Sequence, residues 1–421
     1  MSTPAMANTK GPDIQVVESK SGITAWLVES HNLPMISMEV SFRAGSAFEQ
    51  AEKNGLANIT ADLLDEGAGD RDMSAFHAAL EQIGARLSAD AGTLNLDVNL
   101  TTLTEHKDDA FALLADALTQ PQFAPDAIER QRARIISGIR RIEENPQATA
   151  RRAFQKAVFE DHPYARPPEG TEATVKDITR EDIVNYHKAH FNRANMVVSV
   201  VGDISAEELS HKLDTIFADI PPGTDRNEVT LAPAPVTPQI VRIERDIPQS
   251  TVLFGHLGIS REHPDYFPAF VLNGILGNGG MVSRYMVEVR DKRGLAYHVF
   301  SIMQPLPHAG AFMAGVQTSN DSVDEAIRIM KHEIRDIQEN GVPSAEHARM
   351  LKYLDGSFPL RLDSNQKILG YLSVMQMENL GIDYLDTWRT KVQNVSQADI
   401  QRAAKTLLHP DEVVTVIVGN E

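Results

Sequence analysis

Acidic and imidazole side chains at helical spacing are the first groups in this sequence to consider as metal ligands. His332, Glu333 and Asp336 echo the zinc motif His-Glu-x-x-His, with aspartate in the place of the last ligand. They lie in a charged helical stretch, so we expect them to face solvent. His187 and His190 share a predicted helix, but no carboxylate can be identified as a third ligand. Neither group predicts a metal centre.

The composition excludes several other kinds of chemistry. The chain has no cysteine, which rules out disulfides, thiolate metal sites and a cysteine nucleophile. No serine-triad signature or Walker-type phosphate loop occurs. With 40 basic and 58 acidic residues the formal charge is −18, which argues against nucleic acid as a partner. This charge is compatible with cationic peptide substrates, but the simpler interpretation is a solvated acidic surface.

One segment of the second half combines glycines with polar side chains that can donate hydrogen bonds. We expect Arg290 to end a helix, Gly294 to break it, and Tyr297 to begin a strand near the same sheet edge. Alternation would place Tyr297 on one face with Val299 and every second residue after it. The glycine-rich stretch 277–280 either gives an extended chain access to the backbone or forms a helix-start turn, and both readings stay open.

The sequence contains an internal repeat. The stretches 179–203 and 396–420 each read as an N-cap, a helix, a buried strand and a glycine. A constant offset of 217 residues aligns them, pairing Asp182 with Asp399 near the start of each helix. We interpret the chain as a tandem duplication.

The duplication predicts four segments. They are a flexible tail at 1–14, a first lobe at 15–220, a proline-rich linker at 221–239 and a second lobe at 240–421. Within the first lobe, alternating apolar residues predict half-buried strands, and helical spacing predicts several helices. Neighbouring strands with helices gathered together indicate an α+β fold for each lobe. The expected strands lie near 36–42 and 94–100, and the expected helices at 104–118, 125–144 and 146–159.

An ordered series of short motifs resembles the pitrilysin/insulinase zinc metallopeptidases, or inverzincins. The motifs lie at 55–64, 143–146, 150–154 and 162–171, and the resemblance extends from about residue 16 to residue 421. It is strongest to the branch with bacterial two-lobe peptidases and mitochondrial processing peptidase. The resemblance implies two homologous lobes, each a mostly antiparallel sheet packed with helices.

The same resemblance shows that the zinc site is degenerate. Active members carry His-x-x-Glu-His on the helix after Gly-Leu-Ala, and a later helix supplies a glutamate ligand. In this sequence the two histidine positions are Asn58 and Asp62, the base position is Ala61, and the later ligand falls at Gly138. An amide is a poor zinc ligand, alanine cannot take a proton, and one carboxylate does not hold zinc. We therefore expect no metal in this chain and no peptide hydrolysis by this lobe.

The second-lobe signature of the family is intact. There an arginine and a tyrosine seven residues later form a substrate-binding pair, and the matching residues are Arg290 and Tyr297. Arg293 lies nearby but does not have this spacing. A guanidinium and a phenol can stabilise the oxyanion that forms during peptide hydrolysis, or hold a neighbouring carbonyl. Without the motif, a surface arginine and a half-buried strand tyrosine would be the simpler interpretation.

Together these features predict the zinc-less subunit of a heterodimeric metallopeptidase. A homologous partner would carry the zinc, and four similar lobes would enclose an unfolded peptide. The alternative is a peptide-binding or structural scaffold without catalytic role. An active peptidase would require an unrecognised site.

The compartment stays open. The start of the chain lacks the apolar run of a signal peptide, and no stretch is long enough to span a membrane. The small residues at 4–7 would fit the remnant of a removed signal, which would favour the periplasm over the cytoplasm.

Overall fold

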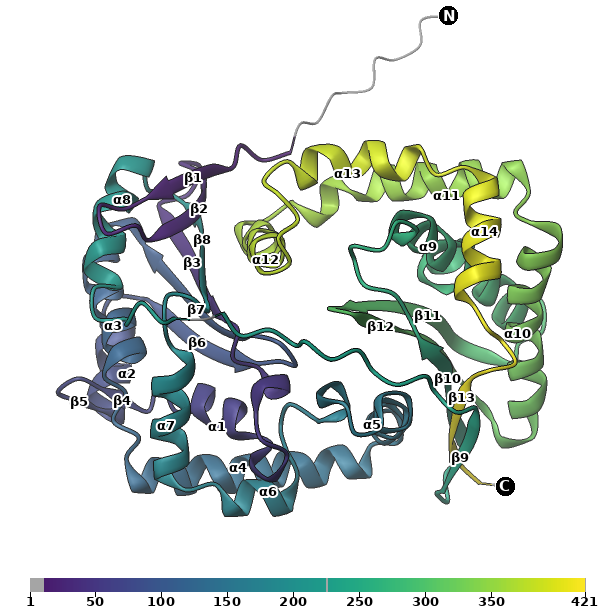
Figure 1. The fold of residues 1–421 in the computed structure, drawn as a ribbon, viewed down its shortest axis with the longest axis horizontal. Coiled ribbons are helices and arrows are strands. Elements are labelled where there is room, and N and C mark those ends of the chain that lie inside the picture. The colour runs from purple at the N-terminus through teal and green to yellow at the C-terminus, as the bar shows by residue number, and fades with distance from the viewer. Residues whose placement is uncertain (1–10, 225, 421) are drawn as a thin grey trace, which may run out of the picture. The chain divides into compact units, whose positions relative to one another are not determined.

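The computed structural model describes residues 11–224 and 226–420, which form two compact units (Figure 1). The described part of the first unit runs to Ile139 and includes Pro167–Glu228 and Pro359–Thr387. The second unit comprises Arg140–Arg166, Val229–Phe358 and the chain from Trp388 onwards. Residues 1–10 of the expected tail lie outside the description.

The first unit is built on a six-stranded sheet in the order β1-β2-β8-β3-β7-β6. Its neighbours are antiparallel except for the parallel pair β2 and β8. The strands are β1 (Gln15–Glu18), β2 (Thr24–Glu29), β3 (Met35–Phe42), β6 (Arg86–Ala91), β7 (Leu96–Leu103) and β8 (Met196–Gly202), with a small hairpin of β4 (Gly67–Ala68) and β5 (Arg71–Asp72). The helices are α1 (Leu56–Asp62), α2 (Met73–Gln82), α3 (Lys107–Thr119), α4 (Pro125–Glu144), α6 (Glu172–Asp177), α7 (Arg180–His190), α8 (Ala206–Ile216) and α12 (Asn365–Met377), and α4 continues into the second unit.

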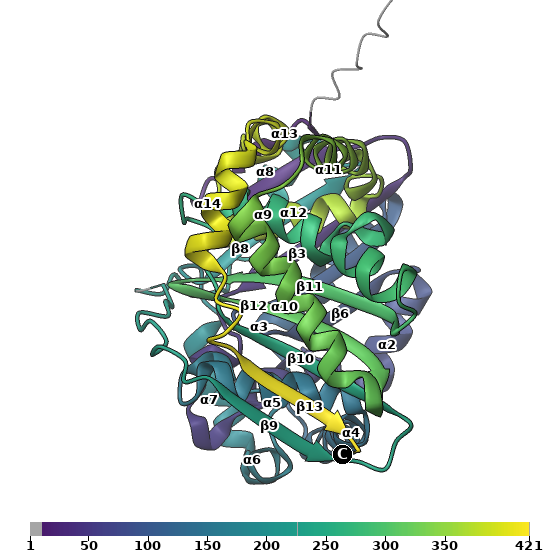
Figure 2. The ribbon, with the colours of Figure 1, turned by 90° about the vertical axis from the view of Figure 1, so that its right-hand side faces the viewer.

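The second unit is built on a five-stranded sheet in the order β11-β12-β10-β13-β9. Only β9 and β13 are parallel. In Figure 2 helix α10 crosses in front of these strands. The strands are β9 (Gln239–Glu244), β10 (Gln249–Leu257), β11 (Ala296–Leu306), β12 (Ala309–Ser319) and β13 (Val414–Gly419). The helices are α5 (Pro146–Phe159), α9 (Tyr266–Asn273), α10 (Val323–Asn340), α11 (Ser344–Ser357), α14 (Gln397–Leu407) and the end of α13 (Tyr384–Gln393), which begins in the first unit.

The repeat is visible in both sheets. The order β2-β8-β3-β7-β6 recurs as β9-β13-β10-β12-β11, with the parallel pair in the same place. Helices α7 and α14 each begin with a capping box, in which Thr179 or Ser396 exchanges hydrogen bonds with the residue three positions later. The predicted α+β fold with two homologous halves is therefore confirmed.

Each half of the sequence contributes one helix to the unit that is built mainly from the other half. Helix α5 belongs to the second unit and packs on β13 and β10, whereas α12 belongs to the first unit and packs on β8 and β3. These strands are equivalent in the two sheets, so the exchange is reciprocal. The compact units are thus a different division from the repeats 15–220 and 240–421, whose boundaries stay a prediction about the duplication. Residues 221–224 and 226–238 contain no helix or strand.

Within the described ranges, no helix is long and apolar enough to cross a membrane.

Candidate functional site

Three residues at the expected zinc-site positions, Asn58, Ala61 and Asp62, lie on the short helix α1 of the first unit. Gly55 precedes the helix with φ +100°, and a carboxylate oxygen of Glu49 accepts a hydrogen bond from its backbone N–H at 3.0 Å. On the helix, Ala61 is buried, and Asn58 Nδ2 lies 3.5 Å from Asp62 Oδ2, at the limit of a hydrogen bond. The amide and the carboxylate therefore face each other, one turn apart.

Helix α4 brings an arginine to this place. Arg134 pairs with Asp62 at 2.6 Å, while Gly138, one turn further along α4, has open space around the position of a missing side chain. Burial raises the pKa of Asp62, and the Arg134 guanidinium offsets this only in part. The cation beside Asp62 is thus a guanidinium, and the residues present do not fit zinc.

The other metal candidates are also explained without a metal. Among the residues that the structure describes, no group of three or more His, Cys, Asp or Glu side chains could hold an ion. His187 and His190 lie at the end of α7, where His187 Nε2 is 2.9 Å from the Leu118 carbonyl oxygen. The expectation that Glu333 faces solvent is wrong: Glu333 is buried and points at Arg284.

In the second unit Arg290 and Tyr297 lie against each other. The Arg290 guanidinium carbon is 4.9 Å from the centroid of the Tyr297 ring, a cation–π distance, and Arg290 Nη1 also contacts Met281 Sδ at 2.9 Å. Tyr297 is 83% exposed. The phenol and the guanidinium therefore form one polar group at the surface of the unit.

The backbone around this pair explains its placement. Arg290 lies in the π-helical turn η7 (Met286–Asp291), which ends where Gly294, at φ +64°, donates its N–H to the Arg290 carbonyl oxygen at 2.8 Å. Tyr297 lies in a bulge of β11, where the register to β12 shifts between Ala296 and Val299. The expectation that Tyr297 shares a face with Val299 is wrong, because the bulge turns the tyrosine outward while Val299 stays buried.

The glycine-rich stretch packs closely against β11. A side chain at Gly277 would lie 2.3 Å from the Ser301 backbone nitrogen, so the π-helical turn η5 (Gly274–Asn278) requires glycine there. Gly280 has φ +65°, which favours glycine at the turn that follows. These contacts explain the glycines by packing and turn geometry, and they leave open whether an extended chain also reaches this backbone.

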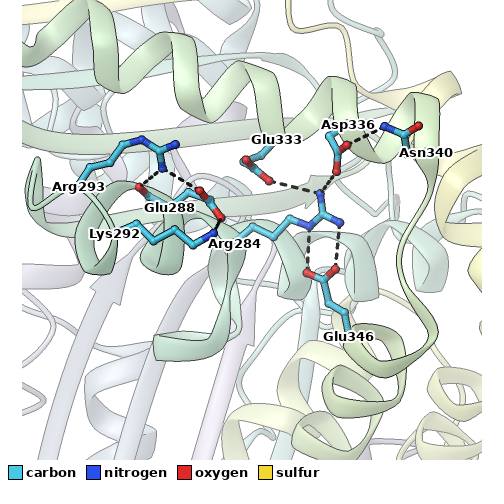
Figure 3. Close-up of polar contacts among 8 residues, drawn as sticks. All are labelled: Arg284, Glu288, Lys292, Arg293, Glu333, Asp336, Asn340 and Glu346. Atoms are coloured by element: carbon cyan, nitrogen blue, oxygen red, sulfur yellow. Dashed lines mark hydrogen bonds and ion pairs between the residues drawn. The ribbon is translucent and has the colours of Figure 1, made fainter.

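Sequence reasoning missed Arg284 as the anchor of this segment. Its side chain, only 10% exposed, binds Glu346 through two nitrogens at 3.0 and 2.9 Å, Asp336 at 2.7 Å and Glu333 at 3.3 Å (Figure 3). Burial alone would lower the pKa of Arg284, but these carboxylates raise it above its ordinary value. Arg284 thereby ties the loop before η7 to α10 and α11. The signal in the sequence was the spacing of Glu333 and Asp336, which lie three residues apart on one helix and both bind Arg284.

Comparisons with known proteins agree with this picture. Residues 25–172 match the family described as Insulinase (Peptidase family M16), and residues 177–354 match Peptidase M16 inactive domain.

Two curated relatives are similar along nearly their whole length. A protein named "Non-peptidase homolog YmxG" from Helicobacter pylori is 25% identical over 395 residues, covering 93% of this chain and 91% of its own. The "Probable mitochondrial-processing peptidase subunit beta" of Schizosaccharomyces pombe is 24% identical over 435 residues, covering 98% and 93%.

A solved structure extends the likeness to three dimensions. The crystal structure of a peptidase M16 inactive domain from Pseudomonas fluorescens has a TM-score of 0.91 and 28% identity, over 97% of this chain and 98% of that one. With two complementary family matches and the duplicated fold, the chain belongs to the M16 peptidase family.

Proposed function

We propose that this chain is the zinc-less subunit of a heterodimeric M16 peptidase and acts on a peptide that a homologous zinc-bearing subunit cleaves. The single observation that carries the proposal is the outward-facing Arg290–Tyr297 pair, in a chain whose Asp62 on α1 pairs with Arg134. A phenol with 83% of its surface exposed gains little from folding. An intermolecular role explains its position better than packing does.

The chemistry of the pair suits a developing negative charge. The Tyr297 O–H and the Arg290 N–H groups can each donate a hydrogen bond to an oxyanion or a carbonyl oxygen. In the complex, the partner's zinc would supply the activated water. The two side chains of this chain would bind the substrate carbonyl and stabilise its charge as the tetrahedral intermediate forms.

Co-purification tests the partnership. The full chain, tagged and expressed in its native source, is expected to bring down an M16 homologue that carries the intact His-x-x-Glu-His motif and about one zinc per heterodimer. The isolated chain is expected to contain no tightly held zinc and to cleave no peptide. Metal analysis and peptide hydrolysis on both samples check this. A stoichiometric zinc in the isolated chain would contradict the proposal.

The second candidate is a peptide-binding or structural scaffold, favoured by the similarity to a relative named as a non-peptidase homologue. It predicts that a complex, if one forms, has the same activity whether or not Arg290 and Tyr297 are intact. The same co-purified material, prepared with variants at these two positions, separates the candidates.

A further inference from the structure

The second unit contains a cavity of about 500 Å³ beside the strand that carries Tyr297. Its walls come from the sheet strands β10, β11 and β12, from the start of α5, and from the glycine-rich stretch with Gly277 and Gly280. Tyr353 of α11, 42% exposed, lies at its margin near Gly280. This volume is in the range of sites that hold a ligand group rather than a single water.

The lining combines apolar side chains with polar ones, such as Gln147 and Gln317, and with one cation, Arg151. Leu253, Phe300, Ile302 and Met313 form the apolar part, and no carboxylate lines the cavity. Arg151 is the charged residue of the lining. A lysine or arginine side chain would therefore lose its hydration here without gaining an anionic partner.

Strand register shows that this apolar character is specific to the second unit. Ser41 pairs with Val197 and with Asp97, while Gly255 pairs with Val414 and with Met313. Because the 217-residue offset aligns Val197 with Val414, Asp97 and Met313 occupy equivalent positions.

The same pairing extends to the neighbouring strands. In the first unit Asp90 lies opposite Asp97, as Ile302 lies opposite Met313 in the second. Glu39 occupies the position equivalent to Leu253. At each of these three places a carboxylate of the first unit is replaced by an apolar side chain in the second. The second-unit face is thus suited to an uncharged group.

The position of the cavity indicates what kind of ligand presents that group. Strand β11 is the outermost strand of its sheet, and no strand of the described chain pairs with its other edge. Backbone donors and acceptors of an edge strand that have no partner can bind an extended chain. His298, Phe300 and Ile302 of this strand line the cavity, so a peptide along the edge would have a side-chain pocket beside it.

We propose that the second unit binds an extended peptide along β11 and takes a bulky apolar side chain, such as leucine, methionine or phenylalanine, into this cavity. The proposal rests on the proposed function in naming its substrate class. It places the specificity for that side chain in the zinc-less subunit.

Direct binding to the isolated full chain tests the pocket separately from catalysis. The probes are fluorescein-labelled nine-residue peptides of Gly, Ser and Thr with phenylalanine, leucine, glutamate or lysine at the centre. Fluorescence polarisation is expected to show phenylalanine and leucine peptides binding at least about tenfold more tightly than the lysine peptide, since burying such a side chain contributes about 1.5–3 kcal/mol.

Two variants locate the binding. Ile302→Asp, at a residue 37% exposed in the cavity wall, is expected to weaken the phenylalanine peptide at least about tenfold and to abolish its advantage over lysine. Ile240→Asp, in β9 at the opposite edge of the same sheet and 66% exposed, is the matched control and should leave binding unchanged. Tyr353→Ala, at the margin of the cavity, is expected to weaken binding of the phenylalanine peptide less than Ile302→Asp does. Circular dichroism checks that each variant is folded.

The outcomes distinguish the two proposals. No measurable binding, equal binding of the phenylalanine and lysine peptides, or equal losses in Ile302→Asp and Ile240→Asp would overturn the pocket while leaving a catalytic role in trans untouched. Selective binding by a chain that never associates with a zinc-bearing homologue would support the pocket and contradict the proposed function.

Discussion

The site around Asp62 on α1 and the Arg290–Tyr297 site differ in the ion pairs that support them. In the first unit, Asp62 pairs with Arg134, whose side chain is 62% exposed, and such a pair contributes little to stability. In the second unit, the segment leading to Arg290 is fixed by Arg284, which is 10% exposed and binds three carboxylates. The segment before Arg290 is thus supported by a buried ion-pair network, whereas Asp62 on α1 pairs with an arginine that is largely exposed.

The two sheets also differ, in the polarity of the side chains at equivalent positions. Their strand order and register are equivalent, yet the helix-facing side carries Glu39, Asp90 and Asp97 in the first unit and apolar residues in the second. The same backbone pairing is present in both sheets, so their faces differ in chemistry while the strand order stays the same. The comparison of the units therefore predicts different responses to matched substitutions.

Restoring ligands at the former metal site should have the largest effect. The variant Asn58→His, Asp62→His, Gly138→Glu is expected to bind about one zinc per chain, whereas the wild type binds none, because three protein ligands make a zinc site. Open space at Gly138 should accommodate the new side chain. Metal analysis after dialysis is the measurement, with Asn58→His, Asp62→His alone as the control. Absence of zinc in the triple variant would show that Gly138 is not the third ligand position.

Removing the buried arginine should strongly destabilise the second unit. Arg284→Met leaves Glu333, Asp336 and Glu346 close together without a cation, which typically costs about 3–5 kcal/mol. Denaturant unfolding followed by Trp388 fluorescence, in a Trp26→Phe background, reports on this unit because Trp388 is its one tryptophan. Arg328→Met, on α10 and 68% exposed, is the control. Equal midpoints for the two variants would contradict the anchoring role.

Neutralising a buried carboxylate of the first unit should stabilise it at alkaline pH. Burial raises the pKa of Asp97 to about 7, above the ordinary value near 3.8, with Glu39 and Asp90 adding to the effect. The folded state therefore holds this proton more tightly than the unfolded chain. The resulting cost is absent below pH 3.8, grows as pH rises and is complete above about 7.

Asp97→Asn is thus expected to raise the free energy of unfolding, by about 1–3 kcal/mol more at pH 8 than at pH 5. Trp26 fluorescence in a Trp388→Phe background follows the first unit, which contains Trp26. Asp109→Asn, on the exposed face of α3, should show no such pH dependence. A gain at pH 5 as large as that at pH 8 would show that ionisation of Asp97 is not the cause.

The smallest effect is expected for the exposed pair. Arg134→Met should change the free energy of unfolding by less than about 1 kcal/mol, since exposed ion pairs are screened by water. The same Trp26 signal measures it. A loss comparable to that of Arg284→Met would remove the contrast between the two sites.

Part of this structure could be predicted from sequence and part could not. The N-caps at Thr179 and Ser396 follow from local spacing, which the sequence displays directly, and the structure confirms them. The outward turn of Tyr297 could not be predicted, because a β-bulge depends on the pairing with β12. The burial of Glu333 was missed for a similar reason: its partner, Arg284, lies 49 residues away in the sequence.

Cleavage of a peptide by the complete heterodimer tests the central claim most directly. With Tyr297→Phe the account predicts an assembled, zinc-loaded complex whose kcat falls about 10²–10³-fold, because one donor to the oxyanion is lost. Tyr371→Phe, which removes a phenolic hydroxyl from α12 of the first unit, is the control and should leave kcat unchanged. An unchanged kcat in Tyr297→Phe and also in Arg290→Ala would contradict the catalytic role and leave the scaffold alternative.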